Sequence, residues 1–259
     1  AAPLFAMIWL GIDLWPTSAD GIIFGQAMAF LGASHAMILA SLYVTGNGDA
    51  RKDANKVWFP LHAMANAYVC YLALPDLTTT LLNPLAALEV SKRGMGFTHG
   101  MVMAVHIYHI LAFFHHFSTE DWVHHIVSVG GVGTMAYLFR WGHIIDAMNV
   151  FVCGLPGGLD YVLLTLVKYG IIEKITEKRY NMWFQTLIRW PGIFLMLYSS
   201  IISKIKLGDA STVGWIPIVI VCLLHGYNGI YYAQKVTGNT HINEMQLREA
   251  KKAQKEKEK

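Results

Sequence analysis

Histidines dominate the candidate chemistry of this chain. Seven of its twelve histidines lie between Phe97 and His125, in a stretch that is otherwise apolar. Ionisable side chains at membrane depth are costly, and they are kept where they bind, relay protons or pair. Two pairs of adjacent histidines flank the polar segment 118–121, so we expect these pairs to meet at the ends of two consecutive helices. The seven are His99, His106, His109, His115, His116, His124 and His125.

The pair His124 and His125 is the best candidate for catalysis. An imidazole acts as a general base toward an amine or hydroxyl group, or as a nucleophile toward an acyl thioester. Asp121 stands three residues before His124 and four before His125, so its carboxylate is placed either to orient an imidazole or to cap the helix. Ser118, three residues before Asp121, fits the capping alternative, and both interpretations stay open.

Other polar residues recur at helical spacing and predict a polar interior. Residues three, four and seven apart share a helix face, which places His99, His106, His109 and His116 in one stripe. An intramembrane arginine seeks a carboxylate, and Asp160 or Asp146 is the expected partner of Arg189. Arg140 or Arg189 would hold a phosphate or carboxylate group. The candidate ligand-binding residues are Arg140, Asp146, Asn149, Asp160, Arg189, His106 and His109.

Composition places these residues in a membrane. Hydrophobic residues make up 54% of the chain and charged residues 14%, against roughly a quarter charged in a soluble domain. Apolar stretches of about 20 residues, enough to cross a bilayer as helix, recur along the chain. We predict an all-α, polytopic transmembrane bundle of about seven helices, preceded by a short N-terminal interfacial helix. The predicted spans are 21–45, 57–80, 97–117, 122–139, 143–167, 182–202 and 213–234.

The domain organisation is simple. Residues 1–20 form the N-terminal interfacial segment, 21–235 a single transmembrane bundle, and 236–259 a charged tail. Lys and Arg concentrate in the connections on the side of the carboxyl terminus, which predicts that this terminus is cytoplasmic. The tail composition predicts disorder or a solvated mixed-charge helix. Its alternating charges exclude nucleic acid, so the expected partners are membrane lipids and, through the tail, other membrane-protein subunits.

The sequence carries no pattern of a known cofactor site. It contains no phosphate-binding loop of the Walker type, no dinucleotide fingerprint and no Gly-x-Ser-x-Gly motif. Cys70, Cys153 and Cys222 all fall inside predicted spans, and their spacing matches neither a zinc pair nor a disulfide framework. We therefore expect no cofactor and no dedicated metal site, and the chemistry of soluble enzymes is excluded.

The segment Asp121-Trp122-Val123-His124-His125-Ile126-Val127-Ser128, followed by Arg140-Trp141-Gly142, resembles the signature of the TLC-domain membrane family, which includes the ceramide synthases. There a His-His pair begins a span, Thr or Ser follows three residues later, and Arg-x-Gly comes after the span. The resemblance covers residues 57–234. It implies six to eight helices, a cytoplasmic carboxyl terminus and lipid acyl transfer at His124, His125 and Asp121. The family's second carboxylate is missing, because Asp146-x-x-Asn149 ends in an amide.

Several functions fit this pattern. The first is a polar, His-lined lipid-binding cavity that serves a lipid acyltransferase of the TLC type. An alternative is a non-catalytic, TLC-like lipid-binding subunit of a larger membrane complex. Another is a di-iron oxidase or desaturase, because neutral imidazoles also suit iron. A transporter is a further alternative, but the sequence lacks the internal repeat that such a protein is expected to have. The resemblance favours the endoplasmic reticulum of a eukaryote, and seven spans also suit a mitochondrial or plastid inner membrane.

Overall fold

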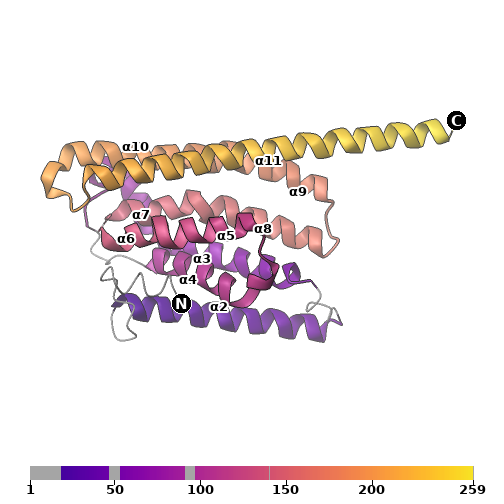
Figure 1. Ribbon diagram of the computed structural model, residues 1–259, viewed down its shortest axis with the longest axis horizontal. Coiled ribbons are helices and arrows are strands. Elements are labelled where there is room, and N and C mark those ends of the chain that lie inside the picture. The colour runs from indigo at the N-terminus through magenta and orange to yellow at the C-terminus, as the bar shows by residue number, and fades with distance from the viewer. Residues whose placement is uncertain (1–18, 47–52, 91–96, 140, 259) are drawn as a thin grey trace.

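The computed structural model describes residues 19–46, 53–90, 97–139 and 141–258, and within these ranges every regular element is a helix (Figure 1). The all-α prediction is therefore confirmed for the described part of the chain. Most of the predicted N-terminal interfacial segment, residues 1–18, and the candidate ligand Arg140 lie outside the described residues.

The helices form long rods. Two begin the bundle, α2 (Ala19–Val44) and α3 (Asn55–Leu82), with the short η2 (Pro84–Ala86) after them. The remaining elements are α4 (Phe97–Phe113), η3 (Phe114–His116), α5 (Thr119–His125), η4 (Ile126–Gly133), α6 (Thr134–Leu138), α7 (His143–Asn149), η5 (Val150–Gly154), α8 (Leu155–Lys168), α9 (Lys174–Phe184), η6 (Gln185–Arg189), α10 (Trp190–Leu207), η7 (Gly208–Ala210) and α11 (Trp215–Lys257).

Five segments of the described chain are long and apolar enough to cross a membrane. This is the architecture of a multi-pass α-helical membrane protein. Two of the seven predicted spans are missing from this set for physical reasons. Helix α4 has 17 residues, or roughly 26 Å of rise, somewhat short of a hydrocarbon core. The rod from α5 to α6 begins with acidic residues and two histidines. The five segments are Gly21–Val44, Asn55–Leu82, His143–Lys168, Lys174–Ala210 and Trp215–Lys257.

Three rods contain a π-helical stretch near their middle: η4, η5 and η6. Proline explains two of them. Pro156 and Pro191 have no N–H to donate to the carbonyl four residues earlier, and their rings press against that carbonyl. The freed carbonyls belong to Val152 and Leu187, which lie inside η5 and η6. Stretches of this kind are frequent at functional sites, and η6 carries the candidate residue Arg189.

Helix α3 runs through the centre of the bundle and packs on α2, α4, α7 and α8. Its approach to the fifth predicted span depends on glycine. A Cβ atom at Gly154 would lie 2.8 Å from the sulfur of Cys70, and one at Gly157 would lie 3.0 Å from the amide nitrogen of Asn66. Larger residues at these positions would push the helices apart. Gly154 and Gly157 therefore permit close packing of α3 against the rod from α7 to α8.

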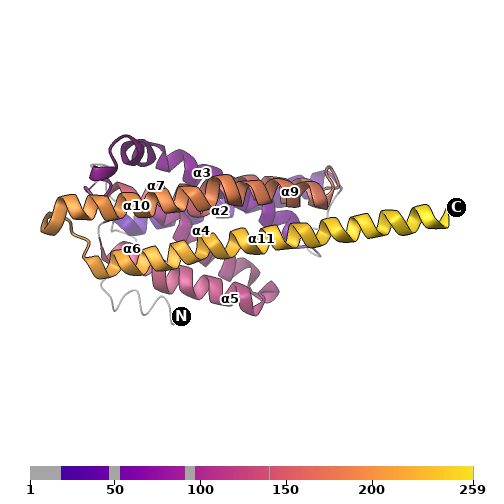
Figure 2. The same ribbon diagram turned by 90° about the horizontal axis from the view of Figure 1, so that it is seen from above.

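Helix α11 contains 43 residues, a length of roughly 64 Å. Its first half packs on α10, its second half packs on α9, and its end projects beyond the bundle (Figures 1 and 2). Arg179 pairs with Glu244 at 2.8 Å, and the Thr240 hydroxyl donates to the Lys178 carbonyl at 3.1 Å. The predicted tail is thus helical up to Lys257. A polar tail continues a helix readily once an apolar span has nucleated it.

Candidate functional site

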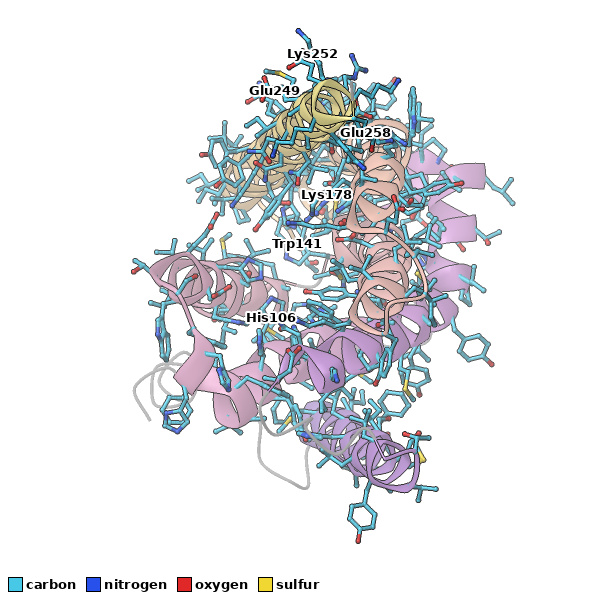
Figure 3. All side chains as sticks on the ribbon, turned by 90° about the vertical axis from the view of Figure 1, so that its right-hand side faces the viewer. His106, Trp141, Lys178, Glu249, Lys252 and Glu258 are labelled. Carbon is cyan, nitrogen blue, oxygen red and sulfur yellow. The ribbon has the colours of Figure 1, made fainter. Side chains whose placement is uncertain are left out.

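Four histidines from two helices lie together and form what we term the histidine cluster: His106 and His109 of α4 with His124 and His125 of α5. Nε2 of His125 lies 3.0 Å from Nδ1 of His109, within hydrogen-bonding distance. The ring centroid of His106 is 5.2 Å from that of His124 and 5.3 Å from that of His125. His125 is buried and His124 is exposed. His106 lies among the helices (Figure 3).

Aromatic side chains hold the cluster in place. The Trp58 ring from α3 stacks on His109 with centroids 3.5 Å apart, and Phe117 stacks on His125 with centroids 4.8 Å apart. Nδ1 of His106 donates to the carbonyl of Val102 at 2.7 Å, which leaves the lone pair of a neutral ring on Nε2. Nδ1 of His125 has no hydrogen-bond partner among the described residues. One nitrogen of the buried imidazole is therefore uncommitted.

Asp121 caps its helix. Its Oδ2 atom accepts hydrogen bonds from the backbone N–H of Ser118 at 2.8 Å and from the Ser118 hydroxyl at 2.7 Å. The Asp121 N–H donates back to that hydroxyl, which completes a capping box. In the described part of the chain no hydrogen bond joins this carboxylate to His124 or His125. Of the two alternatives for Asp121, the structure shows the cap, and Asp121 reaches His124 and His125 by electrostatic interaction without a hydrogen bond among the described residues.

The histidines of the predicted span 97–117 do not all lie at one site. His115 and His116 are exposed in η3, and the ring contacts of His124 and His125 are with His106 and His109 instead. The expectation that the two adjacent pairs meet is therefore wrong in detail. The chain leaves the α-helical path after Phe113 and turns His115 and His116 outward. His99 is buried away from the cluster, with Nε2 3.1 Å from the carbonyl of Gly133.

Arg189 belongs to a polar ladder on η6, α9 and α11. Its Nη1 lies 3.4 Å from Oε1 of Gln185, and its Nη2 donates to Oδ1 of Asn228 at 3.1 Å. Below it, Gln185 donates to Asn181 at 3.0 Å, and Asn181 lies 3.4 Å from Glu177. The guanidinium also lies 4.7 Å above the Tyr232 ring. The predicted ion pair with Asp160 or Asp146 is not formed among the described residues; neutral amides take its place.

The remaining candidate ligands lie on one rod. Asp146 and Asn149 are buried in α7, which packs on α3. Asp160 of α8 interacts electrostatically with Glu177, Lys178 and Arg189. Arg189 in turn lies within electrostatic range of His124, so the polar ladder and the histidine cluster are neighbours. Among the predicted residues, the structure thus brings His106, His109, His124, His125, Arg189 and Asp160 within electrostatic range.

A buried ion pair escaped the sequence prediction. Nδ1 of His143, at the start of α7, lies 2.6 Å from a carboxylate oxygen of Asp76 in α3, whose side chain is 4% exposed. Asp76 was visible as an acidic residue inside a predicted span, and such a residue requires a partner. His143 was visible as the first residue of the fifth predicted span, three spans after the one that contains Asp76. Sequence spacing could not pair them, because they lie 67 residues apart.

A surface contact ties α5 to α11. Glu120 forms an ion pair with Lys235 and accepts a hydrogen bond from the Tyr231 hydroxyl at 2.9 Å. The hydrogen bonds from Lys235 and Tyr231 lower the pKa of Glu120 below its ordinary value of 4.5. Because Glu120 is exposed, the contact is open to solvent and screened by salt. It fixes the helix that carries His124 and His125 against the long C-terminal helix.

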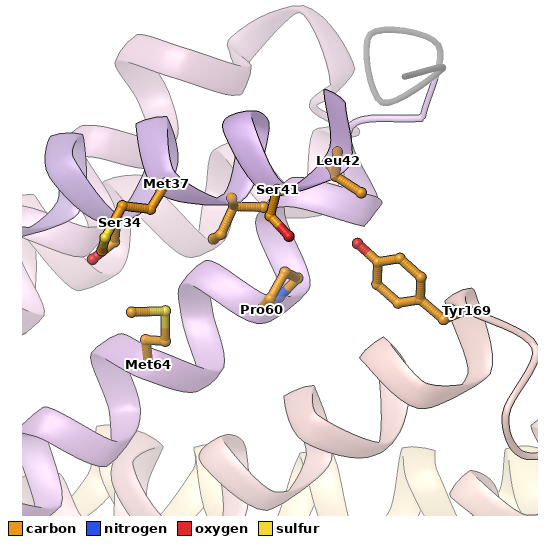
Figure 4. A pocket seen from close by; sticks show the side chains of 8 residues that line it. Ser34, Met37, Ser41, Leu42, Pro60, Met64 and Tyr169 are labelled. Atoms are coloured by element: carbon orange, nitrogen blue, oxygen red, sulfur yellow. The ribbon is translucent and has the colours of Figure 1, made fainter. Parts of the chain in front are cut away.

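A groove among the described residues lies away from the histidine cluster and Arg189. It has a volume of about 260 Å³ and lies between α2, α3 and Tyr169, lined mainly by apolar side chains such as Met37 and Met64 (Figure 4). Pro60 leaves the carbonyl of Lys56 without its helical partner, and the Tyr169 hydroxyl approaches that carbonyl at 3.4 Å. The volume is below that of typical ligand pockets, about 300–1,000 Å³. The groove contains none of the predicted site residues.

No group of three or more His, Cys, Asp and Glu side chains in the described ranges is arranged to hold a metal ion. The di-iron alternative thus has no described set of ligands. Comparison with protein families, with curated proteins and with solved structures gives no match. Function therefore has to be argued from the geometry of the side chains.

Proposed function

We propose that this protein binds a lipid in the polar interior between the histidine cluster and Arg189, and transfers an acyl group to it. The observation that carries the proposal is the hydrogen-bonded pair His109–His125, in which Nδ1 of the buried His125 has no hydrogen-bond partner among the described residues. A pair of imidazoles from two helices is an arrangement for moving a proton. Arg189, within electrostatic range of His124, supplies positive charge to the same interior.

The tautomer of the pair decides which nitrogen reacts. If His125 Nε2 carries the proton and donates to His109, then Nδ1 of His125 has the lone pair and acts as the base. It would accept the proton of an acceptor hydroxyl or amine as that atom attacks the acyl thioester. The carbon–sulfur bond breaks, and the proton passes to the departing thiolate. Ester or amide and free thiol are then the products, and the imidazole is regenerated.

The resemblance to the TLC-domain family supports this choice of reaction, since His124 and His125 carry it. We further propose a cytoplasmic carboxyl terminus, on the strength of the Lys and Arg residues near that end. We also propose that the protein lies in the membrane of the endoplasmic reticulum. It would have seven spans, with α4 and the rod α5–α6 crossing the membrane beside the five long helices. The lipids of the bilayer are the proposed partners.

A non-catalytic lipid-binding subunit is the second candidate. Two observations favour it: Asp121 is committed to the cap and Asn149 takes the place of a carboxylate, so neither orients an imidazole. The projecting end of α11 would then be the contact with other subunits. The two candidates share the lipid but differ in whether His125 is required for turnover.

The experiment uses the full chain purified in lipid nanodiscs. It is incubated with a radiolabelled long-chain acyl thioester and a panel of lipid hydroxyl and amine acceptors, and the products are separated. His125→Ala is compared with His115→Ala, which removes an exposed imidazole outside the cluster. Loss of a general base lowers the rate by about 10²–10⁴-fold. We expect this loss for His125→Ala alone.

Folding is checked by gel filtration and circular dichroism of each variant. Full turnover by His125→Ala would contradict the catalytic proposal. Absence of turnover in the unmodified protein, with lipid retained on purification, would favour the non-catalytic subunit.

A further inference from the structure

The guanidinium of Arg189 has N–H donors that make no hydrogen bond to the described residues. The group carries five N–H donors in a planar fork. Nη1 and Nη2 each have one neutral partner, the amide oxygens of Gln185 and Asn228. The Nε–H is buried and has no hydrogen-bond partner among the described residues. The edge formed by Nε and the neighbouring Nη atom, which matches two oxygens of a carboxylate or phosphate, is therefore incompletely used.

The positive charge of Arg189 is also not compensated by contact. No carboxylate of the described residues forms an ion pair with it. Glu177, at the far end of the amide ladder, stands three helical turns away, roughly 18 Å, and pairs with Lys178 at 3.1 Å. Asp160 interacts with Arg189 only at longer range. A half-buried charge without a close partner is unfavourable, and an anionic ligand would offset this cost.

The neighbours of Arg189 hold it in position. Gln185 lies one turn earlier on η6, and Asn228 reaches across from α11, so two separate elements fix the plane of the guanidinium. The Tyr232 ring lies against one face of that plane at 4.7 Å. The tyrosine covers one face of the guanidinium, and the amides accept from Nη1 and Nη2, so the Nε edge is left as the position for a ligand. Preorganisation of this kind raises affinity.

We propose that the Nε edge of Arg189 binds the anionic end group of a lipid, a carboxylate or a phosphate, through two parallel hydrogen bonds. The inference deepens the proposed function, because it rests on the proposed binding of a lipid between Arg189 and the histidine cluster. It assigns the lipid an acidic class. It also makes Arg189 a binding residue, with Gln185 and Asn228 as positioning residues.

The test measures lipid binding without turnover, by native mass spectrometry of the full chain in detergent. The probes are oleic acid and phosphatidic acid, with oleyl alcohol and diacylglycerol as neutral counterparts and inorganic phosphate as the free anion. The variants are Arg189→Lys and Arg189→Gln. Arg179→Gln is the matched control, because Arg179 is a surface arginine paired with Glu244. Circular dichroism confirms that each variant is folded.

We expect one acidic lipid to bind at least about tenfold more tightly than its neutral counterpart. Arg189→Lys keeps the charge and loses the planar fork, so it should lose most of this preference, and Arg189→Gln should lose all of it. Arg179→Gln should keep it. Whichever of oleic and phosphatidic acid is preferred identifies the end group as carboxylate or phosphate.

Equal affinity for acidic and neutral lipids, binding of inorganic phosphate alone, or an unchanged preference in a folded Arg189→Lys protein would each overturn the inference. The outcome is independent of catalysis. If His125→Ala retains the preference and no acyl turnover is found, the proposed reaction fails and the anion site stands. If turnover depends on His125 and Arg189→Lys binds like the unmodified protein, the anion site fails and the reaction stands.

Discussion

Two histidine sites in this bundle are built in opposite ways. His143 lies 2.6 Å from a buried carboxylate, that of Asp76, whereas His125 faces another imidazole, that of His109, at 3.0 Å. The carboxylate that sequence spacing offers to His125, that of Asp121, is turned back into the capping box. The first imidazole is thus held by an ion pair between two helices, and the second keeps one nitrogen uncommitted.

The difference separates structure from chemistry. A carboxylate beside an imidazole at a helix contact joins α3 to α7 and fixes their register. An imidazole pair with an open nitrogen has little to contribute to stability, and it can accept a proton from a ligand. The expected consequence is that changes at Asp76 alter folding, whereas changes at His125 alter turnover. The predictions below test this contrast, from the largest expected effect on stability to the smallest.

Asp76→Asn should destabilise the protein strongly. The change removes the charge of a buried carboxylate that is hydrogen-bonded to His143, and loss of a hydrogen bond to a charged group costs about 1.5–3 kcal/mol; the lower end applies because the His143 side chain remains 18% exposed. Thermal unfolding in detergent, followed by circular dichroism, measures the loss. The matched change at the other site, His125→Asn, should lower the melting temperature by clearly less. Equal destabilisation by the two variants would erase the contrast.

Ser118→Ala should have an intermediate effect that is confined to α5. The variant removes the side chain that accepts from the Asp121 N–H, and loss of such a cap costs about 1 kcal/mol. Hydrogen exchange of the α5 amides is the suitable measurement, because local opening should increase there and stay constant in α3. The companion variant Asp121→Asn should behave like Ser118→Ala. If Asp121→Asn lost as much turnover as His125→Ala, Asp121 would instead have a role at the imidazole.

Glu120→Gln should have the smallest effect, and that effect should depend on pH. The pKa of Glu120 is lowered by Lys235 and Tyr231, so the contact contributes its full stability above the ordinary pKa of 4.5 and loses it as the pH falls through the lowered value. The melting temperatures of Glu120→Gln and of the unmodified protein should therefore differ slightly at pH 7 and converge as the pH falls below the lowered pKa of Glu120. A difference that is as large at pH 3 as at pH 7 would contradict this origin.

Hydropathy predicted the helical architecture well, and the spans that it placed least securely are those rich in histidine. Long apolar stretches determine helices such as α2 and α10 almost by themselves, because no other element buries its backbone groups in lipid. In the rod α5–α6, by contrast, acidic residues and histidines lower the hydropathy, and length and composition do not mark it as a span. The sequence left open whether the tail is disordered or helical, because its conformation depends on tertiary contact with α9.

The candidate site was predictable as a set of residue types, and its pairing was not. Helical spacing placed His106 and His109 on one face, and they do meet α5. Helical spacing did not predict local breaks of the backbone. The 3₁₀ turn at η3 is such a break, and it directs His115 and His116 outward. Long-range pairs such as Asp76 with His143 depend on how helices pack. Arg189 donates to the amides of Gln185, one turn away, and of Asn228 on α11, although carboxylates were the expected partners.

One measurement tests the central claim most directly: acyl transfer per folded molecule for His125→Asn and Asp76→Asn, assayed in nanodiscs at a temperature where both variants are folded. We expect His125→Asn to lose at least about 100-fold in rate. Asp76→Asn should stay within about twofold of the unmodified protein, as for a change away from the reacting groups. Full transfer by His125→Asn, or equal losses in both variants, would contradict the account.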